Sequence, residues 1–132
     1  MKDALVIEQC IQQHIANVEA IWVYGSVAKG SAGEKSDIDI AVLAPLPISF
    51  QVRLDTIVTL NSRLGREVDL VDMRSVAAVL RKEIVAHGKR IFCADAMRCE
   101  MYEDFIYADY ARLNEERALI LKDIFERKSI YG

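Results

Sequence analysis

The chain has 132 residues, of which 52% are hydrophobic and 28% are charged, and its formal net charge is −3. This length supports one hydrophobic core, so we expect a single domain over residues 1–132. A protein that grips extended DNA or RNA usually carries a basic excess, so the acidic balance argues against nucleic acid as the main ligand. Neither a signal-peptide pattern nor an apolar run of membrane-spanning length occurs in the sequence, so we expect a cytoplasmic protein that binds no membrane.

The apolar residues recur with helical spacing in some segments and with strand-like spacing in others. In chain order, the predicted elements are a helix from Asp3 to about Val18, a strand over Ile21–Tyr24, a strand over Ile38–Leu43, a helix over Ser49–Leu64, a strand over Glu67–Val71, a helix over Ser75–His87, a strand over Lys89–Cys93 and a long helix over about 95–128. Asp3 and Asp95 are predicted N-terminal caps, and Gly65 and Gly88 are predicted C-terminal caps. Helices that alternate with short strands indicate the α/β class, with a short mixed sheet flanked by helices.

The loop after the first predicted strand carries the densest chemical signal. Gly25 and Ser26 directly follow that strand, and after ten further residues Asp37 and Asp39 open the next one. Side chains alternate along a strand, so the two carboxylates share one face, roughly 7 Å apart. At this separation they can share hard divalent cations, and the glycines of the loop let backbone amides approach an anion. The pattern indicates chemistry on a nucleoside triphosphate.

A third carboxylate strengthens this interpretation. Asp69 lies within a predicted core strand, where an ionised side chain needs a specific role. If this strand neighbours the second one, Asp69 reaches the edge that carries Asp37 and Asp39, and three carboxylates suit two Mg²⁺ ions about 3.5–4 Å apart. Glu67 shares the face of Asp69 and is the main rival for the third ligand. Asp72 points the other way and is better explained as a turn or helix-start residue.

The loop also offers groups for the phosphates. We expect Ser26 and nearby backbone amides to hold the terminal phosphates, and Lys29 to neutralise part of their charge. Each feature has a structural alternative: a flexible glycine loop, an edge pair of aspartates, and a solvent-exposed strand residue at Asp69. All three alternatives would have to hold together, which the spacing and the strand context argue against.

These residues resemble a known family, the nucleotidyltransferase superfamily related to DNA polymerase β. The residues that carry the resemblance are Gly25, Ser26, Ala28, Lys29, Gly30, Ser36, Asp37 and Asp39. The short length and the Asp69 strand at the expected distance look like its minimal nucleotidyltransferases, which occur as MntA-type antitoxins beside toxins with HEPN domains. The resemblance covers roughly residues 18–73, and the catalytic core would span about 18–94.

The resemblance implies roles for individual residues. Asp37 and Asp39 would bind both metal ions, Mg²⁺ or Mn²⁺, and Asp69 would complete the site. The nucleotide-binding residues would be Gly25, Ser26, Lys29 and Ser36. Lys29 stands where the family often has arginine, so the charge is kept but a bidentate phosphate grip is lost. The preference for ATP comes from the resemblance alone, because no residue pattern here identifies a base-reading pocket.

The final predicted helix is longer than a compact domain needs, and its apolar residues spread around more than one face. Three of the five tyrosines of the chain fall between residues 102 and 110, and aromatic residues are enriched at interfaces. Glu100, Glu103, Asp104 and Asp109 make the same region acidic, which would suit a basic partner. Two interpretations stand: a helix folded entirely across its own sheet, or a helix shared between the core and another protein.

Taken with the resemblance, the sequence predicts an enzyme that transfers AMP from ATP to a hydroxyl of a cognate HEPN toxin, with tyrosine as the expected acceptor. We expect this antitoxin to form a hetero-oligomer with the toxin. One alternative is a small-molecule nucleotidyltransferase of the aminoglycoside type, which would need a substrate-binding domain that we do not expect in a chain of this length. Another is a binding-only antitoxin, against which the complete set of Asp37, Asp39 and Asp69 argues.

Overall fold

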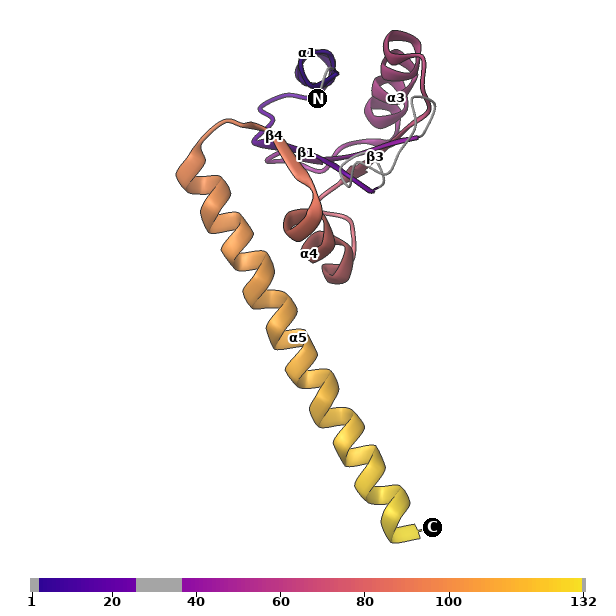
Figure 1. The fold of residues 1–132 in the computed structure, drawn as a ribbon, viewed down its shortest axis with the longest axis vertical. Helices are drawn as coiled ribbons and strands as arrows, with labels where there is room; N and C mark the ends of the chain where they lie inside the picture. Colours follow the sequence, from indigo (N-terminus) through magenta and orange to yellow (C-terminus); the bar gives the residue numbers. More distant parts are fainter. Residues whose placement is uncertain (1–2, 26–36, 132) are drawn as a thin grey trace.

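The structure is a computed structural model that describes residues 3–25 and 37–131, with side chains to Lys128 (Figure 1). Ser26, Lys29 and Ser36, which the sequence predicts to bind nucleotide, lie outside the described residues. The elements in chain order are α1 (Ala4–His14), β1 (Ala20–Tyr24), β2 (Ile38–Leu43), α3 (Phe50–Leu64), β3 (Val68–Asp72), α4 (Ala78–His87), β4 (Lys89–Cys93) and α5 (Ala96–Tyr131).

The four described strands form one mixed sheet in the order β3-β2-β1-β4. β1 pairs antiparallel with both β2 and β4, whereas β2 and β3 run parallel. This arrangement confirms the predicted α/β class with a mixed sheet. It also makes β3 an edge strand, with β2 as its neighbour.

Strand alternation sends successive side chains into two separate cores. Ile38 and Ile40 of β2 belong to a buried cluster with residues of α1 and α3. Ala41 and Leu43, from the other face of β2, belong to a second cluster with Trp22, Ile84 of α4 and residues of α5. The sheet therefore separates α1 and α3 from α4 and α5, as Figure 1 shows. Asp39 lies between Ile38 and Ile40 and so faces the α4 and α5 side.

The caps agree with the sequence at some helix ends and differ at others. The Ser49 hydroxyl accepts a hydrogen bond from the Val52 amide, and Gly65 adopts φ 65° at the end of α3. The Asp95 carboxylate accepts from the Arg98 amide at the start of α5. Asp3 stands at the N-cap of α1 but makes no side-chain capping bond.

Two helices are shorter than the apolar pattern predicts. α1 ends at His14 instead of near Val18, because Ile15 takes an extended conformation with φ −120° and ψ 124°; Asn17, with φ 56°, lies in the turn before β1. α4 begins at Ala78 instead of Ser75. The Asp72 carboxylate accepts hydrogen bonds from the backbone amides of Ile48 and Arg74, and these bonds hold a turn where the helix was expected. Gly88 ends α4 with φ −76° and is therefore not a left-handed cap.

α5 is longer than the predicted final helix and runs past α4 before extending beyond the rest of the domain (Figure 1). Its first turns pack on the sheet, where the Tyr102 and Trp22 rings lie 6.1 Å apart between centroids. The free thiols of Cys93 and Cys99 join the end of β4 to α5, with their sulfur atoms 3.0 Å apart. Within the described part of the chain, no helix is both long and apolar enough to cross a membrane.

Candidate active site

The parallel pairing of β2 and β3 places two strand aspartates beside each other. Asp39 stands opposite Asp69 in the register. The neighbouring residues Ile38, Ile40 and Leu70 point into the core on the other face of the sheet. Asp37 precedes β2 by one residue and is exposed, and its charge acts on the Asp39 carboxyl. The three carboxylates predicted from the sequence therefore gather at one corner of the sheet.

Gly25 lies against this carboxylate group at the end of β1. Its φ is +73°, a conformation that favours glycine, and a Cβ atom there would collide with Oδ2 of Asp39. Glycine thus allows the backbone that leads into the predicted phosphate loop to approach Asp39 closely. The structure brings Gly25, Asp37, Asp39 and Asp69 together, as the sequence predicts for their positions.

Tyr24 belongs to this corner and was missed by the sequence analysis. It pairs with Asp39 in the β1–β2 register and is half-buried. Burial, followed by the negative charges of Asp39 and Asp69, raises the pKa of the Tyr24 phenol to about 12. Its hydroxyl therefore stays protonated at neutral pH and remains able to donate a hydrogen bond. The available signal was its position directly before Gly25.

The carboxylates repel one another. Burial, followed by the charges of Asp69 and Asp37, raises the pKa of the Asp39 carboxyl above its ordinary value. Asp37 and Asp69 are exposed and Asp39 is half-buried, so a positive ligand at this corner would offset the repulsion among them. The corner is therefore suited to a cation or to a cation–phosphate complex.

Arg53 of α3 is a second residue that the sequence analysis did not identify. Its Nε donates to the backbone oxygen of Leu70 at 2.6 Å, and its Nη2 lies 3.5 Å from Oδ1 of Asp69. Asn61 of the same helix accepts a hydrogen bond from the Val68 amide at 2.7 Å. Both side chains hydrogen-bond to backbone groups on the outer edge of β3. These groups are therefore not free to pair with a further strand. No pattern in the sequence places a residue of this helix beside Asp69.

Two other acidic residues near the corner take different positions. Glu67 is exposed and lines an open hollow of about 510 Å³ together with Asp37, Asn61, Gly65 and Arg66. Asp72 is buried and its carboxylate binds backbone amides, which agrees with the turn role predicted from the sequence.

The residue types at this corner fit a divalent cation. Carboxylate oxygens are hard ligands, and Mg²⁺ is commonly held by one or two carboxylates together with substrate phosphates. Among residues 3–25 and 37–131, no three acidic, histidine or cysteine side chains converge closely enough to enclose a metal ion alone. An ion bound here would need further oxygen ligands, which a triphosphate can supply.

A second hollow lies away from these carboxylates. It measures about 250 Å³ and is lined in part by Glu19, Arg74, Arg98 and Tyr102. Glu19 precedes Ala20, whereas Asp39 pairs with Tyr24 at the opposite end of β1. The hollow and the carboxylate corner therefore lie at opposite ends of β1.

The chain is similar to known nucleotidyltransferases. The family model for polymerase β nucleotidyltransferases matches residues 6–97. The chain is 32% identical over 118 residues to the protein adenylyltransferase MntA of Shewanella oneidensis. The aligned region covers 89% of this chain and 84% of that protein. The chain is also 31% identical over 84 residues to the probable protein adenylyltransferase MntA of Haemophilus influenzae, covering 62% of this chain and 73% of that protein.

Solved structures show the same similarity. A toxin–antitoxin crystal structure with AMP-PNP superposes with a TM-score of 0.83 and 31% identity, covering 93% of this chain and 98% of that chain. A complex of a tri-AMPylated Shewanella oneidensis HEPN toxin with its MNT antitoxin gives a TM-score of 0.77 and 29% identity, covering 94% and 97% of the two chains. Because the family model spans well over half of its length, the chain belongs to the polymerase β nucleotidyltransferase family.

Proposed function

We propose that this protein is an antitoxin that transfers AMP from ATP to a hydroxyl, expected to be a tyrosine, of a cognate HEPN toxin and thereby neutralises it. The observation that carries the proposal is the register match of Asp39 with Asp69, with Asp37 and Gly25 at the same corner. The similarity to the protein adenylyltransferase MntA of Shewanella oneidensis, and to the antitoxin in a complex with an AMPylated HEPN toxin of that organism, supports a protein acceptor.

The proposed reaction moves an adenylyl group from ATP to the acceptor oxygen and releases pyrophosphate. The acceptor hydroxyl oxygen attacks the α-phosphorus of ATP, a new oxygen–phosphorus bond forms, and the bond from the α-phosphorus to the bridging oxygen breaks. Pyrophosphate leaves, and the proton of the hydroxyl passes to water. The close approach of Gly25 to Asp39 holds the start of the phosphate loop beside the carboxylates, so that the triphosphate and the acceptor can meet at one corner.

We expect the reaction to require Mg²⁺ or Mn²⁺. When bound, the metal supplies positive charge that offsets the charge of the triphosphate and of the departing pyrophosphate. Asp37, Asp39 and Asp69 are the residues that would hold it, and Gly25, Ser26, Lys29 and Ser36 are expected to contact the nucleotide. We expect the antitoxin to act in the cytoplasm, where ATP is available, and to form a hetero-oligomer with the toxin.

The proposal is tested by combining the purified cognate HEPN toxin with labelled ATP and Mg²⁺ and measuring the toxin mass. We expect the wild-type chain to add AMP to the toxin, and the Asp37→Asn/Asp39→Asn double variant to add none while it still binds the toxin. In parallel, survival of cells that express the toxin is measured with each form.

The same experiment separates the enzyme from a binding-only antitoxin. Full protection of cells by the double variant, with no added mass on the toxin, would overturn enzymatic neutralisation. Labelling of an aminoglycoside or another small hydroxyl compound in place of the toxin would support the small-molecule alternative.

A further inference from the structure

α5 buries one stripe of side chains against its own domain. Cys99 and Ile106 are buried at 3% and 2% exposure, Tyr102 packs on Trp22, and the Lys82 ammonium lies 5.3 Å from the centre of the Tyr110 ring. These α5 residues follow one another at intervals of three or four, so they lie on one side of the helix.

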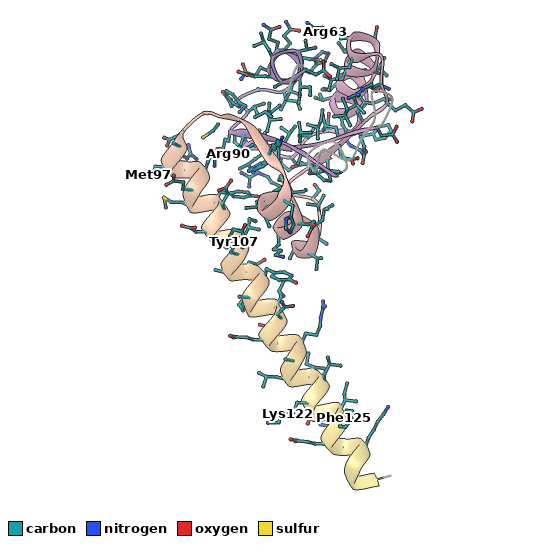
Figure 2. The ribbon with its side chains drawn as sticks, in the orientation of Figure 1. Arg63, Arg90, Met97, Tyr107, Lys122 and Phe125 are labelled. Atoms are coloured by element: carbon teal, nitrogen blue, oxygen red, sulfur yellow. The ribbon has the colours of Figure 1, made fainter. Side chains whose placement is uncertain are left out.

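The same stripe continues where α5 has left the domain. Four large apolar residues lie there, and we call them the distal patch: Ile120, Leu121, Ile124 and Phe125. Their exposed fractions range from 45% to 80%. Ile120 and Ile124 continue the spacing of Tyr102 and Ile106, so the patch faces the side on which the domain lies. Figure 2 places Phe125 on the part of α5 that extends beyond α4.

A second copy of this chain is a poor occupant for the distal patch. Arg117 lies three residues before Ile120, and Arg127 lies three residues after Ile124, both at positions that point toward a paired helix. A two-fold antiparallel pair centred on the isoleucines would place Arg117 of each copy opposite Arg127 of the other. A parallel pair of α5 helices would place the Arg117 side chains of the two copies opposite each other. The domains of both copies would also have to lie on the paired side of the helices.

We propose that the distal patch binds the acceptor protein, through a helix of that protein whose apolar face is flanked by carboxylates. This inference rests on the proposed function, because it takes the acceptor to be the helical HEPN toxin. Arg117 and Lys128 bracket the patch, and neither has an ion-pair partner among the described residues, so both are available to pair with carboxylates of the toxin.

The position of the patch also favours this occupant. A protein seated on it lies on the domain side of α5 and can reach toward the sheet that carries Asp39 and Asp69. α5 would then hold the toxin while the toxin presents its hydroxyl to the catalytic corner, which shortens the search for the reactive geometry. Covering these four exposed apolar side chains would contribute to the binding free energy through the hydrophobic effect.

Two of the acidic α5 residues that the sequence suggested for a basic partner form ion pairs with arginines of this chain. Glu103 pairs with Arg90 at 3.0 Å, and both side chains are largely covered. Asp109 pairs with Arg112 at 2.9 Å. These two ion pairs leave less of the acidic region free for a partner, and the docking surface that we infer is the distal patch.

The test measures the affinity of the full chain for the purified HEPN toxin by calorimetric titration without ATP. We expect Phe125→Glu and Ile124→Glu to weaken binding at least about tenfold. We expect Arg117→Glu to weaken binding as well, and wild-type binding to weaken with added salt. Leu119→Glu is the matched control, because Leu119 is 67% exposed in the same segment but lies on the opposite side of the helix. It should bind as the wild type does.

Melting curves and ATP titrations of each variant check that the fold and the nucleotide site are intact. If the wild type labels the toxin but Phe125→Glu binds the toxin normally, the docking surface is wrong and the proposed function stands. If the wild type does not label the toxin at all, the proposed function fails instead. Sedimentation of the chain alone is expected to give a monomer; a dimer that Phe125→Glu dissociates would assign the patch to a second copy and overturn the inference.

Discussion

The backbone of Gly25 lies so close to the carboxylate of Asp39 that no side chain fits between them. Gly25 follows β1 and Asp39 stands in β2, so this contact couples the entry of the predicted phosphate loop to a carboxylate of the neighbouring strand. The glycine is needed for two separate reasons, a positive φ and a lack of space.

We predict that Gly25→Ala lowers the free energy of unfolding by at least about 1–2 kcal/mol, because alanine is strained at positive φ. It should also abolish AMP transfer, since the new methyl group displaces Asp39. Gly65→Ala is the control, because Gly65 has φ +65° but no atom within 4 Å of its added Cβ. Gly65→Ala should lower the free energy of unfolding by a similar amount through backbone strain and should keep its transfer activity. Loss of activity in both variants would mean that backbone strain alone explains the effect of Gly25→Ala.

Removing the charge of Asp39 and removing the carboxylate of Asp72 should have opposite effects on stability and on AMP transfer. Asp39→Asn removes repulsion among three carboxylates, so we expect an unchanged or higher melting temperature and no AMP transfer. Asp72→Ala removes the acceptor of the Ile48 and Arg74 amides, and we expect a loss of about 1–3 kcal/mol in unfolding free energy with transfer retained in the folded fraction. Urea denaturation and toxin labelling measure the two effects. Normal labelling by Asp39→Asn would remove Asp39 from the active site.

We predict that Arg53 positions Asp69. Arg53→Gln should reduce the rate of AMP transfer several-fold and leave ATP affinity nearly unchanged, because the guanidinium contacts Asp69 and the β3 backbone. Arg53→Lys should recover only part of the rate, since lysine cannot make both contacts from one planar group. Arg63→Gln, near the other end of α3, serves as the control. A wild-type rate in Arg53→Gln would show that Asp69 needs no support from α3.

The ion pair between Arg90 and Glu103 should support the docking of α5 on its own domain. We expect Glu103→Lys to lower the free energy of unfolding by roughly 1 kcal/mol, a modest value because the pair lies near the surface. Reversing both charges, with Arg90→Glu and Glu103→Lys together, should restore most of this loss. Toxin affinity, measured on the same proteins, should stay within about twofold of the wild type once the domain is folded. A large loss of affinity with unchanged stability would instead place Glu103 in the interface.

The local features of this protein were predictable from the sequence. The bounds of β2 and β4 and the C-terminal cap at Gly65 follow from side-chain alternation, glycine conformations and capping chemistry. These rules act over a few residues, so the order of residues carries them directly. The early end of α1 before Ile15 and the late start of α4 were not predictable from the apolar pattern. At α4, hydrogen bonds to the Asp72 carboxylate hold a turn where the pattern favours a helix.

The tertiary structure decided which distant residues meet. The parallel pairing of β2 with β3 sets Asp69 opposite Asp39, although the residues between them form a helix and two loops. Arg53 reaches Asp69 only because α3 packs along the edge of the sheet, and Glu103 is engaged because α5 crosses β4 near Arg90. Periodicity shows that α5 has apolar sides, whereas only the packing shows where the domain stops covering them and leaves Ile120 and Phe125 exposed. Such contacts depend on how whole elements pack in space, which no local spacing rule specifies.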